Sequence, residues 1–210
     1  MFGQKNIRTG CAIWLQWVLL TTLGRLAATG LTMQLPANLD MLLSSTAFFI
    51  FQALVILALG AGIAAIQWLV LRRYFAGAAR WIVASSVGML IGGMVAFPLK
   101  LRDLYVGPSG FQLDELAYGA VFGVLMGSAQ WLVVRTWVHH AGWWVLSSAI
   151  GWTLGMAVGE LLPLNWNSPY AGLVYGTITE SIPVAATGLT LVILLQNTLD
   201  TTPVVNKNAG

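Results

Sequence analysis

The sequence predicts an all-α polytopic membrane protein with six transmembrane helices. The first observation behind this prediction is composition: 58% of the 210 residues are hydrophobic and 8% are charged, whereas an ordinary soluble domain is about 25% charged. The second is run length, since several apolar runs reach the ~20 residues that cross a bilayer. The third is an internal repeat, because residues 67–97 align without a gap with residues 130–160.

Each copy of the repeat has two apolar runs that flank a short basic turn, which is the pattern of a helical hairpin. The motif W-[VI]-[LV]-x-[ST]-x-x-G begins at Trp81 and Trp144, and it occurs a third time at Trp17. A two-helix repeat restores the chain direction each time, so we expect three parallel hairpins, which a pseudo-threefold axis along the membrane normal would relate. The predicted hairpins span residues 11–72, 80–135 and 142–196.

The elements follow in order from the apolar runs. Residues 1–10 form a predicted cytoplasmic segment, residues 11–196 a single transmembrane domain, and residues 197–210 a flexible cytoplasmic tail. The first run resembles a signal peptide in its small residues. It is too long for a typical signal sequence and carries the repeated motif, so we expect a retained helix. The predicted helices are 12–33, 45–72, 80–99, 116–135, 142–162 and 172–195.

Loop charge predicts the orientation. With the N-terminus inside, seven basic residues lie on the inner side, and only Lys100 and Arg102 lie on the outer side. Cytoplasmic loops of membrane proteins carry an excess of Lys and Arg. Both chain ends are therefore predicted to be cytoplasmic. The inner basic residues are Lys5, Arg8, Arg72, Arg73, Arg80, Arg135 and Lys207.

Tryptophan and arginine recur together at the predicted inner boundary. Trp68, Trp131 and Trp144 are typical of an interfacial aromatic belt, and Arg72 and Arg135 are placed to reach the lipid head groups by snorkelling. Gln67 and Gln130, which precede two of these tryptophans, are expected to bond neighbouring helices. A binding site for anionic lipid head groups is the alternative interpretation.

Two charged residues fall inside predicted membrane spans. Arg25 and Glu180 lie at nearly the same depth in the first and last helices, which are neighbours if the three hairpins close into a ring. The other copies of the repeat have apolar residues at these positions. An isolated charge at that depth is costly, so the sequence predicts an Arg25–Glu180 ion pair.

The surroundings of Glu180 leave two interpretations open. Pro183 removes a backbone donor and is predicted to kink the helix, and nearby hydroxyl groups are candidates to satisfy the freed carbonyls. One interpretation is that this polar centre is a fixed structural junction that closes the ring between the first and last helices. The other is that it is a binding site for a substrate or a proton. Glu160 is a candidate member of this network or of the outer interface. The hydroxyl residues are Thr177, Thr179 and Ser181.

Several function classes lack the residues they need. No catalytic motif, phosphate loop or nucleic-acid module is present, so we predict no enzyme, no metal, no cofactor and no nucleic-acid partner. His139 and His140 are expected in a solvated turn, with ligation of a pigment or metal as the alternative. Glycines repeat every fourth residue, as at Gly119 and Gly123, which favours close helix packing inside the bundle, with a dimer face or a cofactor groove as the alternatives.

The stretches Gln67–Arg72 (QWLVLR) and Ala141–Ser147 (AGWWVLS) resemble a loose group of uncharacterised multi-span bacterial membrane proteins, including cyanobacterial ones. The resemblance implies a bacterial inner membrane, or a thylakoid if the source is cyanobacterial, and implies no activity. We expect a structural or accessory subunit that packs with lipid, a larger membrane complex or a second copy. A small transporter or channel with its polar site at Arg25 and Glu180 is the alternative, and a pigment-binding protein or membrane-embedded enzyme is the second alternative.

Overall fold

The computed structural model describes residues 2–36, 39–102, 105–106, 111–168 and 170–200. Six long helices make up most of this part of the chain: α1 Phe2–Thr32, α3 Ser45–Leu71, α4 Arg80–Ala96, α5 Leu113–Val134, α6 Gly142–Glu160 and α7 Ala171–Asp200. The all-α prediction is therefore correct for every long element, and the predicted bounds of α3 agree to one residue. Helix α1 begins at Phe2, within the predicted N-terminal segment and ahead of the first helix that was predicted at residues 12–33.

Four short elements were not expected from the sequence. Helix α2 (Leu39–Leu42) precedes α3, and the 3₁₀ helix η1 (Phe97–Arg102) continues α4. Strands β1 (Tyr105–Val106) and β2 (Phe111–Gln112) pair antiparallel just before α5. All four elements are too short to show a hydrophobic period.

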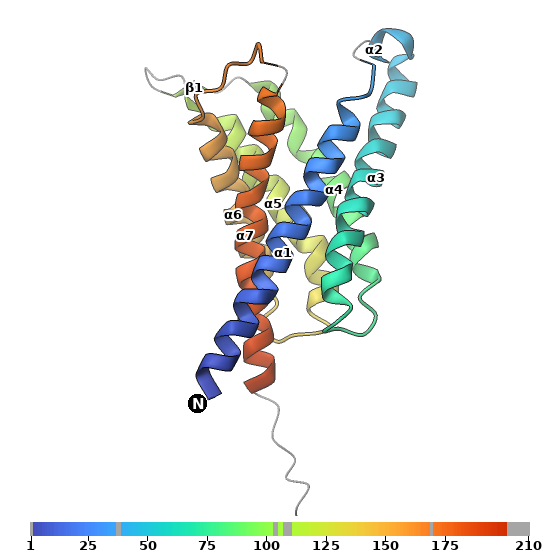
Figure 1. Cartoon of the computed structure of the whole chain (residues 1–210). Coiled ribbons are helices and arrows are strands. Elements are labelled where there is room, and N and C mark those ends of the chain that lie inside the picture. Colours follow the sequence, from blue (N-terminus) through green and yellow to red (C-terminus); the bar gives the residue numbers. More distant parts are fainter. Residues whose placement is uncertain (1, 37–38, 103–104, 107–110, 169, 201–210) are drawn as a thin grey trace, which may run out of the picture.

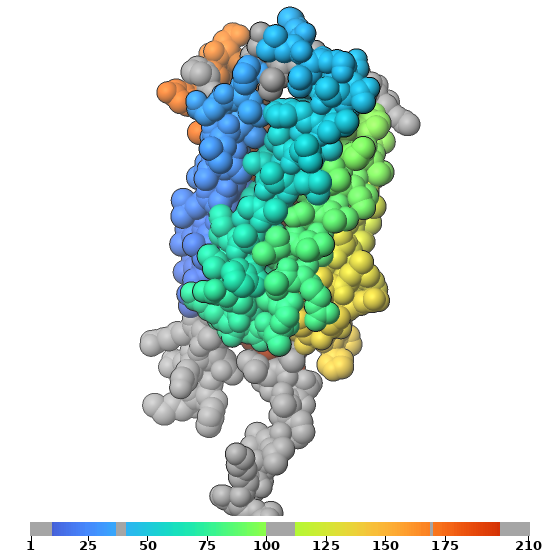
Figure 2. All heavy atoms as spheres, turned by 90° about the vertical axis from the view of Figure 1, so that its right-hand side faces the viewer, coloured from blue at the N-terminus to red at the C-terminus, as the bar shows by residue number. Residues whose placement is uncertain are grey.

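The long helices are arranged as a closed ring. Each helix from α3 to α7 packs against the next one along the chain, and α1 packs against both α7 and α3. The first and last helices are thus neighbours, as ring closure requires. The N-terminal end of α1 and the C-terminal end of α7 lie at the same end of the bundle (Figure 1). Figure 2 shows α1, α3 and α4 side by side on one face.

The outer surface of the ring suits lipid. Large apolar side chains point outward from every long helix, including Phe49 at 72% and Val83 at 65% exposure. Five of the described helices are long and apolar enough to cross a membrane. Helix α6, of 19 residues, is not among them. Other outward-facing side chains are Leu23, Met94, Leu132, Leu154 and Leu189.

The repeated glycines mostly face neighbouring helices. A side-chain methyl at Gly123 of α5 would collide with the backbone of α6, and one at Gly88 of α4 would collide with Ala129 of α5. These glycines let helices approach closely, where dispersion contacts hold them together. Gly172 and Gly176 of α7 differ, because no atom lies within 4 Å of a Cβ built on either of them.

Candidate functional site

Three tryptophans meet at the centre of the ring. Trp17 of α1, Trp81 of α4 and Trp144 of α6 are 1%, 0% and 1% exposed. Their ring centroids lie 5.3–6.0 Å apart in edge-to-face geometry, which is a favoured arrangement of aromatic pairs. The three are the first residues of the recurring W-[VI]-[LV]-x-[ST]-x-x-G motif, so one comes from each predicted hairpin.

Two of these tryptophans make the same hydrogen bond. Trp81 Nε1 donates to Gln67 Oε1 over 3.0 Å, and Trp144 Nε1 donates to Gln130 Oε1 over 2.9 Å. Gln130 Nε2 in turn donates to Ser85 Oγ over 3.1 Å. Gln130 therefore ties α5 to both α4 and α6, and Gln67 ties α3 to α4. The expectation that both glutamines bond neighbouring helices is confirmed.

The third tryptophan has no such partner. Aligning Gly172 and Gly176 of α7 with Gly119 and Gly123 of α5 places Pro183 where α5 has its glutamine. Trp17 Nε1 is buried and has no hydrogen-bond partner among the described residues. The hydroxyl of Thr21 and the Nε of Arg25 are likewise buried without a hydrogen-bond partner among the described residues. All three lie at four-residue spacing, so they lie on one face of α1.

Arg25 and Glu180 form a salt bridge between α1 and α7. Arg25 Nη1 lies 2.5 Å from Glu180 Oε2, and the two side chains are 10% and 28% exposed. The guanidinium also lies 5.2 Å from the ring centroid of Trp152 on α6, within the range of a cation–π contact. The pair thus lies where the first and last helices of the ring meet.

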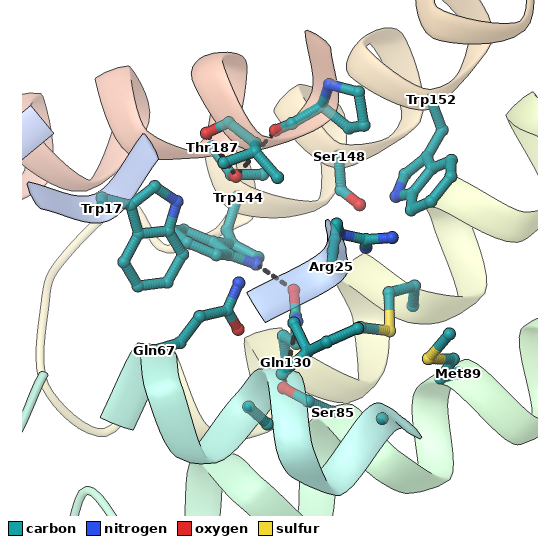
Figure 3. A pocket seen from close by; sticks show the side chains of 16 residues that line it. Trp17, Arg25, Gln67, Ser85, Met89, Gln130, Trp144, Ser148, Trp152 and Thr187 are labelled. Atoms are coloured by element: carbon teal, nitrogen blue, oxygen red, sulfur yellow. Dashed lines mark hydrogen bonds between the residues drawn. The ribbon is translucent and has the colours of Figure 1, made fainter. Parts of the chain in front are cut away.

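Arg25 lies between two small cavities. The central cavity has a volume of about 30 Å³, which is enough for one or two water molecules. Figure 3 shows Gln67, Gln130 and Trp144 around it, and all six long helices contribute to its wall. The second cavity, of about 10 Å³, lies between α1 and α7 and includes Glu180 in its wall.

Helix α7 continues through Pro183, which packs directly on α6. A methyl at Gly151 would lie 2.7 Å from Pro183 Cα, and one at Gly155 would overlap the carbonyl oxygen of Thr179. That carbonyl is the one that Pro183 leaves without its helical donor. The glycines of α6 therefore accommodate the backbone of α7 around the proline.

The hydroxyl groups near Pro183 do not bond the freed carbonyl, so that expectation is wrong. Thr177 donates to Leu173 O, and Thr179 donates to Tyr175 O. Ser181 donates to Thr177 O. Each side chain bonds a carbonyl one turn earlier on α7, a common way for Ser and Thr to satisfy themselves in a helix.

The expected interfacial residues divide into two groups. Arg72 lies 4.9 Å from the ring centroid of Trp68, and Arg135 lies 4.7 Å from that of Trp131. Trp144 does not belong with them, because it is 1% exposed and bonded to Gln130. Its assignment as a lipid anchor is wrong. The indole N–H of Trp144 already donates to an acceptor inside the bundle, so it does not require a polar partner at the membrane interface.

The remaining predicted residues lie at the two ends of the bundle. Glu160 lines a pocket of about 580 Å³ with Glu115, Trp166 and Tyr175 at the end away from the two chain ends. His140 lines a pocket of about 390 Å³ with Trp143, Thr190 and Asn197, among others, at the opposite end. Among the described residues, no three side chains of the metal-binding types come together.

His140 adopts a backbone conformation that is unusual for a residue with a side chain. Its φ is 58°, and Gly77, the residue at the same place in the first copy of the repeat, has a φ of 68°. Both turns follow the same path, and glycine adopts it without strain. Histidine at positive φ costs roughly 1 kcal/mol or more.

The tryptophan cluster was not predicted from the sequence, although a signal for it was present. In each motif, Ser or Thr follows Trp by four residues and Gly follows by seven, so all three lie on one helix face. Thr21, Ser85 and Ser148 are all buried beside the tryptophans.

No protein-family model, curated protein or solved structure matches the chain.

Proposed function

We propose that this chain is a structural or accessory subunit of a bacterial inner membrane, or of a thylakoid if the source is cyanobacterial. The observation that carries the proposal is the filled interior of the ring. Three buried tryptophans occupy its centre, and the central cavity measures about 30 Å³. Small-molecule sites in proteins usually measure about 300–1,000 Å³. The interior of the bundle is therefore suited to packing and not to binding a small molecule of ordinary size. The function proposed here is accordingly one of contacts made by the outer surface.

The proposal includes six membrane spans and cytoplasmic chain ends. Helix α6 lies between α5 and α7, both of which are long and apolar enough to cross a membrane. At 1.5 Å per residue its 19 residues extend roughly 28 Å, close to the hydrocarbon thickness of about 30 Å. The basic residues Arg72, Arg73, Arg80 and Arg135 lie in the turns at the end of the bundle that holds both chain ends.

The outward face of α7 favours a protein neighbour. Gly172 is exposed and has open space where a side chain would be, whereas Gly176 lines the small cavity between α1 and α7 and the glycines of α5 pack inside. A small exposed residue such as Gly172 allows another transmembrane helix to approach closely. A partner helix from a membrane complex or a second copy of this chain fits this face.

Site-specific photocrosslinking in the native membrane tests this proposal. A photoreactive residue is placed at Gly172 of α7 and at the outward positions Val83 of α4 and Leu154 of α6. We expect a protein adduct of defined mass at Gly172 and lipid adducts at the other two positions. Lipid adducts at all three positions would contradict an accessory role through α7.

A small transporter is the second candidate, and one observation favours it. Arg25 lies between the central cavity and the cavity beside Glu180, so its charge is available to both. The test is solute flux in proteoliposomes that contain the purified chain. Flux that disappears when Arg25 and Glu180 are both replaced by leucine supports transport. Absence of flux of any small ion leaves the accessory proposal as the better one.

A further inference from the structure

The central cavity is lined by hydrogen-bond donors. An indole N–H only donates, so the amide oxygens of Gln67 and Gln130 must face Trp81 and Trp144. Each amide therefore turns its NH₂ group away from the indole. Gln130 uses its NH₂ on Ser85, and Gln67 Nε2 has no bonded acceptor among the described residues.

Further donors lie around the same space. The hydroxyls of Ser85 and Ser148 line the cavity, as do Trp17 and Arg25. Trp17 Nε1 and Arg25 Nε are buried and unpartnered among the described residues. Thr187, also in the wall, directs its hydroxyl to Pro183 O. The described side chains of the wall thus include no carboxylate and no free amide oxygen.

The cavity also has a positive wall. Arg25 is the one charged residue among the described residues that line it. Its partner Glu180 does not line it, because the carboxylate lies in the separate cavity between α1 and α7. A cation in the central cavity would therefore meet like charge, whereas an anion would meet a guanidinium and several N–H and O–H groups.

We propose that the central cavity binds one small monovalent anion of halide size, held by Arg25 and by the donors of Gln67, Ser85 and Ser148. The volume of about 30 Å³ admits an ion of the size of chloride and excludes larger organic anions. This proposal goes beyond the packing role proposed above and would give the transporter candidate a substrate class.

In this arrangement the guanidinium of Arg25 interacts with two anionic groups, the Glu180 carboxylate and the bound halide. The Glu180 carboxylate and a bound halide compete for Arg25, so anion binding is strongest when the carboxylate is removed by substitution. Tyr118 of α5 also interacts electrostatically with both members of the pair. The single ionisable residue of α6, Glu160, lines the pocket that it shares with Glu115, Trp166 and Tyr175. Replacing Glu180 by a neutral residue is therefore expected to strengthen anion binding.

Thermal unfolding in two salts of equal ionic strength, chloride and gluconate, tests the proposal. Glu180→Gln removes the competing charge, so we expect a higher Tm in chloride, since a ligand at ten times its Kd favours the folded state about 11-fold. The wild-type chain, in which the Glu180 carboxylate competes for Arg25, should show a smaller chloride effect. Glu180→Ala, which removes the same charge, keeps the test decisive if Glu180→Gln does not fold.

The control variants differ by one guanidinium. Arg25→Gln combined with Glu180→Gln keeps a neutral hydrogen-bonding pair and should lose the chloride effect. Arg72→Gln removes an exposed arginine and should keep the wild-type effect. Equal Tm values in both salts for Glu180→Gln, or an undiminished chloride effect in the double variant, would mean that the cavity holds water alone. Neither result would bear on the crosslinking test of the accessory role.

Discussion

Gly155 of α6 lies directly against the main-chain carbonyl of Thr179, the carbonyl that Pro183 leaves without a helical donor. The contact joins two departures from an ordinary helix pair: a proline on one helix and a missing side chain on the other. A weak Cα–H···O contact is the type of interaction that such close approach permits. Substitution of the glycine is therefore expected to force α6 and α7 apart.

We predict that Gly155→Ala destabilises the protein by about 2 kcal/mol or more, because the new methyl overlaps backbone that cannot rotate away. The matched control is Gly172→Ala on α7, where a methyl enters open space. That change should be neutral or stabilising by up to about 1 kcal/mol, the difference in helix propensity. Unfolding free energies in mild detergent measure both. Equal effects would show that the close approach of α6 and α7 has no energetic weight.

We predict that removing one member of the Arg25–Glu180 pair costs about 3 kcal/mol or more, since it leaves an unpaired charge inside the bundle. Arg25→Leu and Glu180→Leu should each have this effect, and the double variant should recover most of the loss. The coupling energy from this double-mutant cycle is the measurement. Additive effects of the two changes would mean that the pair does not stabilise ring closure.

We predict that Trp144→Phe is more destabilising than Trp17→Phe by about 1–3 kcal/mol. Both changes remove the same volume from the tryptophan cluster. Only the first leaves a buried amide oxygen, Gln130 Oε1, without its donor. The Nε1 of Trp17 has no partner to lose among the described residues. The comparison of the two unfolding free energies isolates the hydrogen bond, and equal values would contradict it.

We predict that His140→Gly stabilises the chain by up to about 1 kcal/mol, because glycine accepts a positive φ without strain. His139→Gly is the control, since its φ is not positive, and it should bring no gain. If His140→Gly instead lowers stability, the imidazole itself makes contacts that outweigh the strain.

The sequence predicted the long helices and the charge pair because both follow from the cost of polar groups in lipid. Arg25 and Glu180 were identifiable as partners since each departs from an apolar repeat position at the same depth. The location of Trp144 was not predictable in this way. Tryptophan near a helix end favours the interface on average, and only the position of Gln130 on a neighbouring helix reverses that preference.

The bonds around Pro183 could not be predicted for a related reason. Sequence spacing places Thr177, Thr179 and Ser181 near the freed carbonyl, but a hydroxyl one turn away on the same helix already has a nearer acceptor. The packing of Gly155 on that carbonyl depends on how α6 and α7 cross. Such a contact is decided by tertiary geometry and leaves no local trace.

Because α1 and α7 together close the ring, the two halves of the Arg25–Glu180 pair are separated by nearly the whole of protein synthesis. Helices α3 to α6 are all made after Arg25 and before Glu180. Helix α1 with its arginine is thus synthesised first, and the carboxylate of Glu180 becomes available only when the last helix has been made. A chain that stops short of α7 therefore lacks the carboxylate that compensates Arg25, and an unpaired charge inside a membrane span is costly.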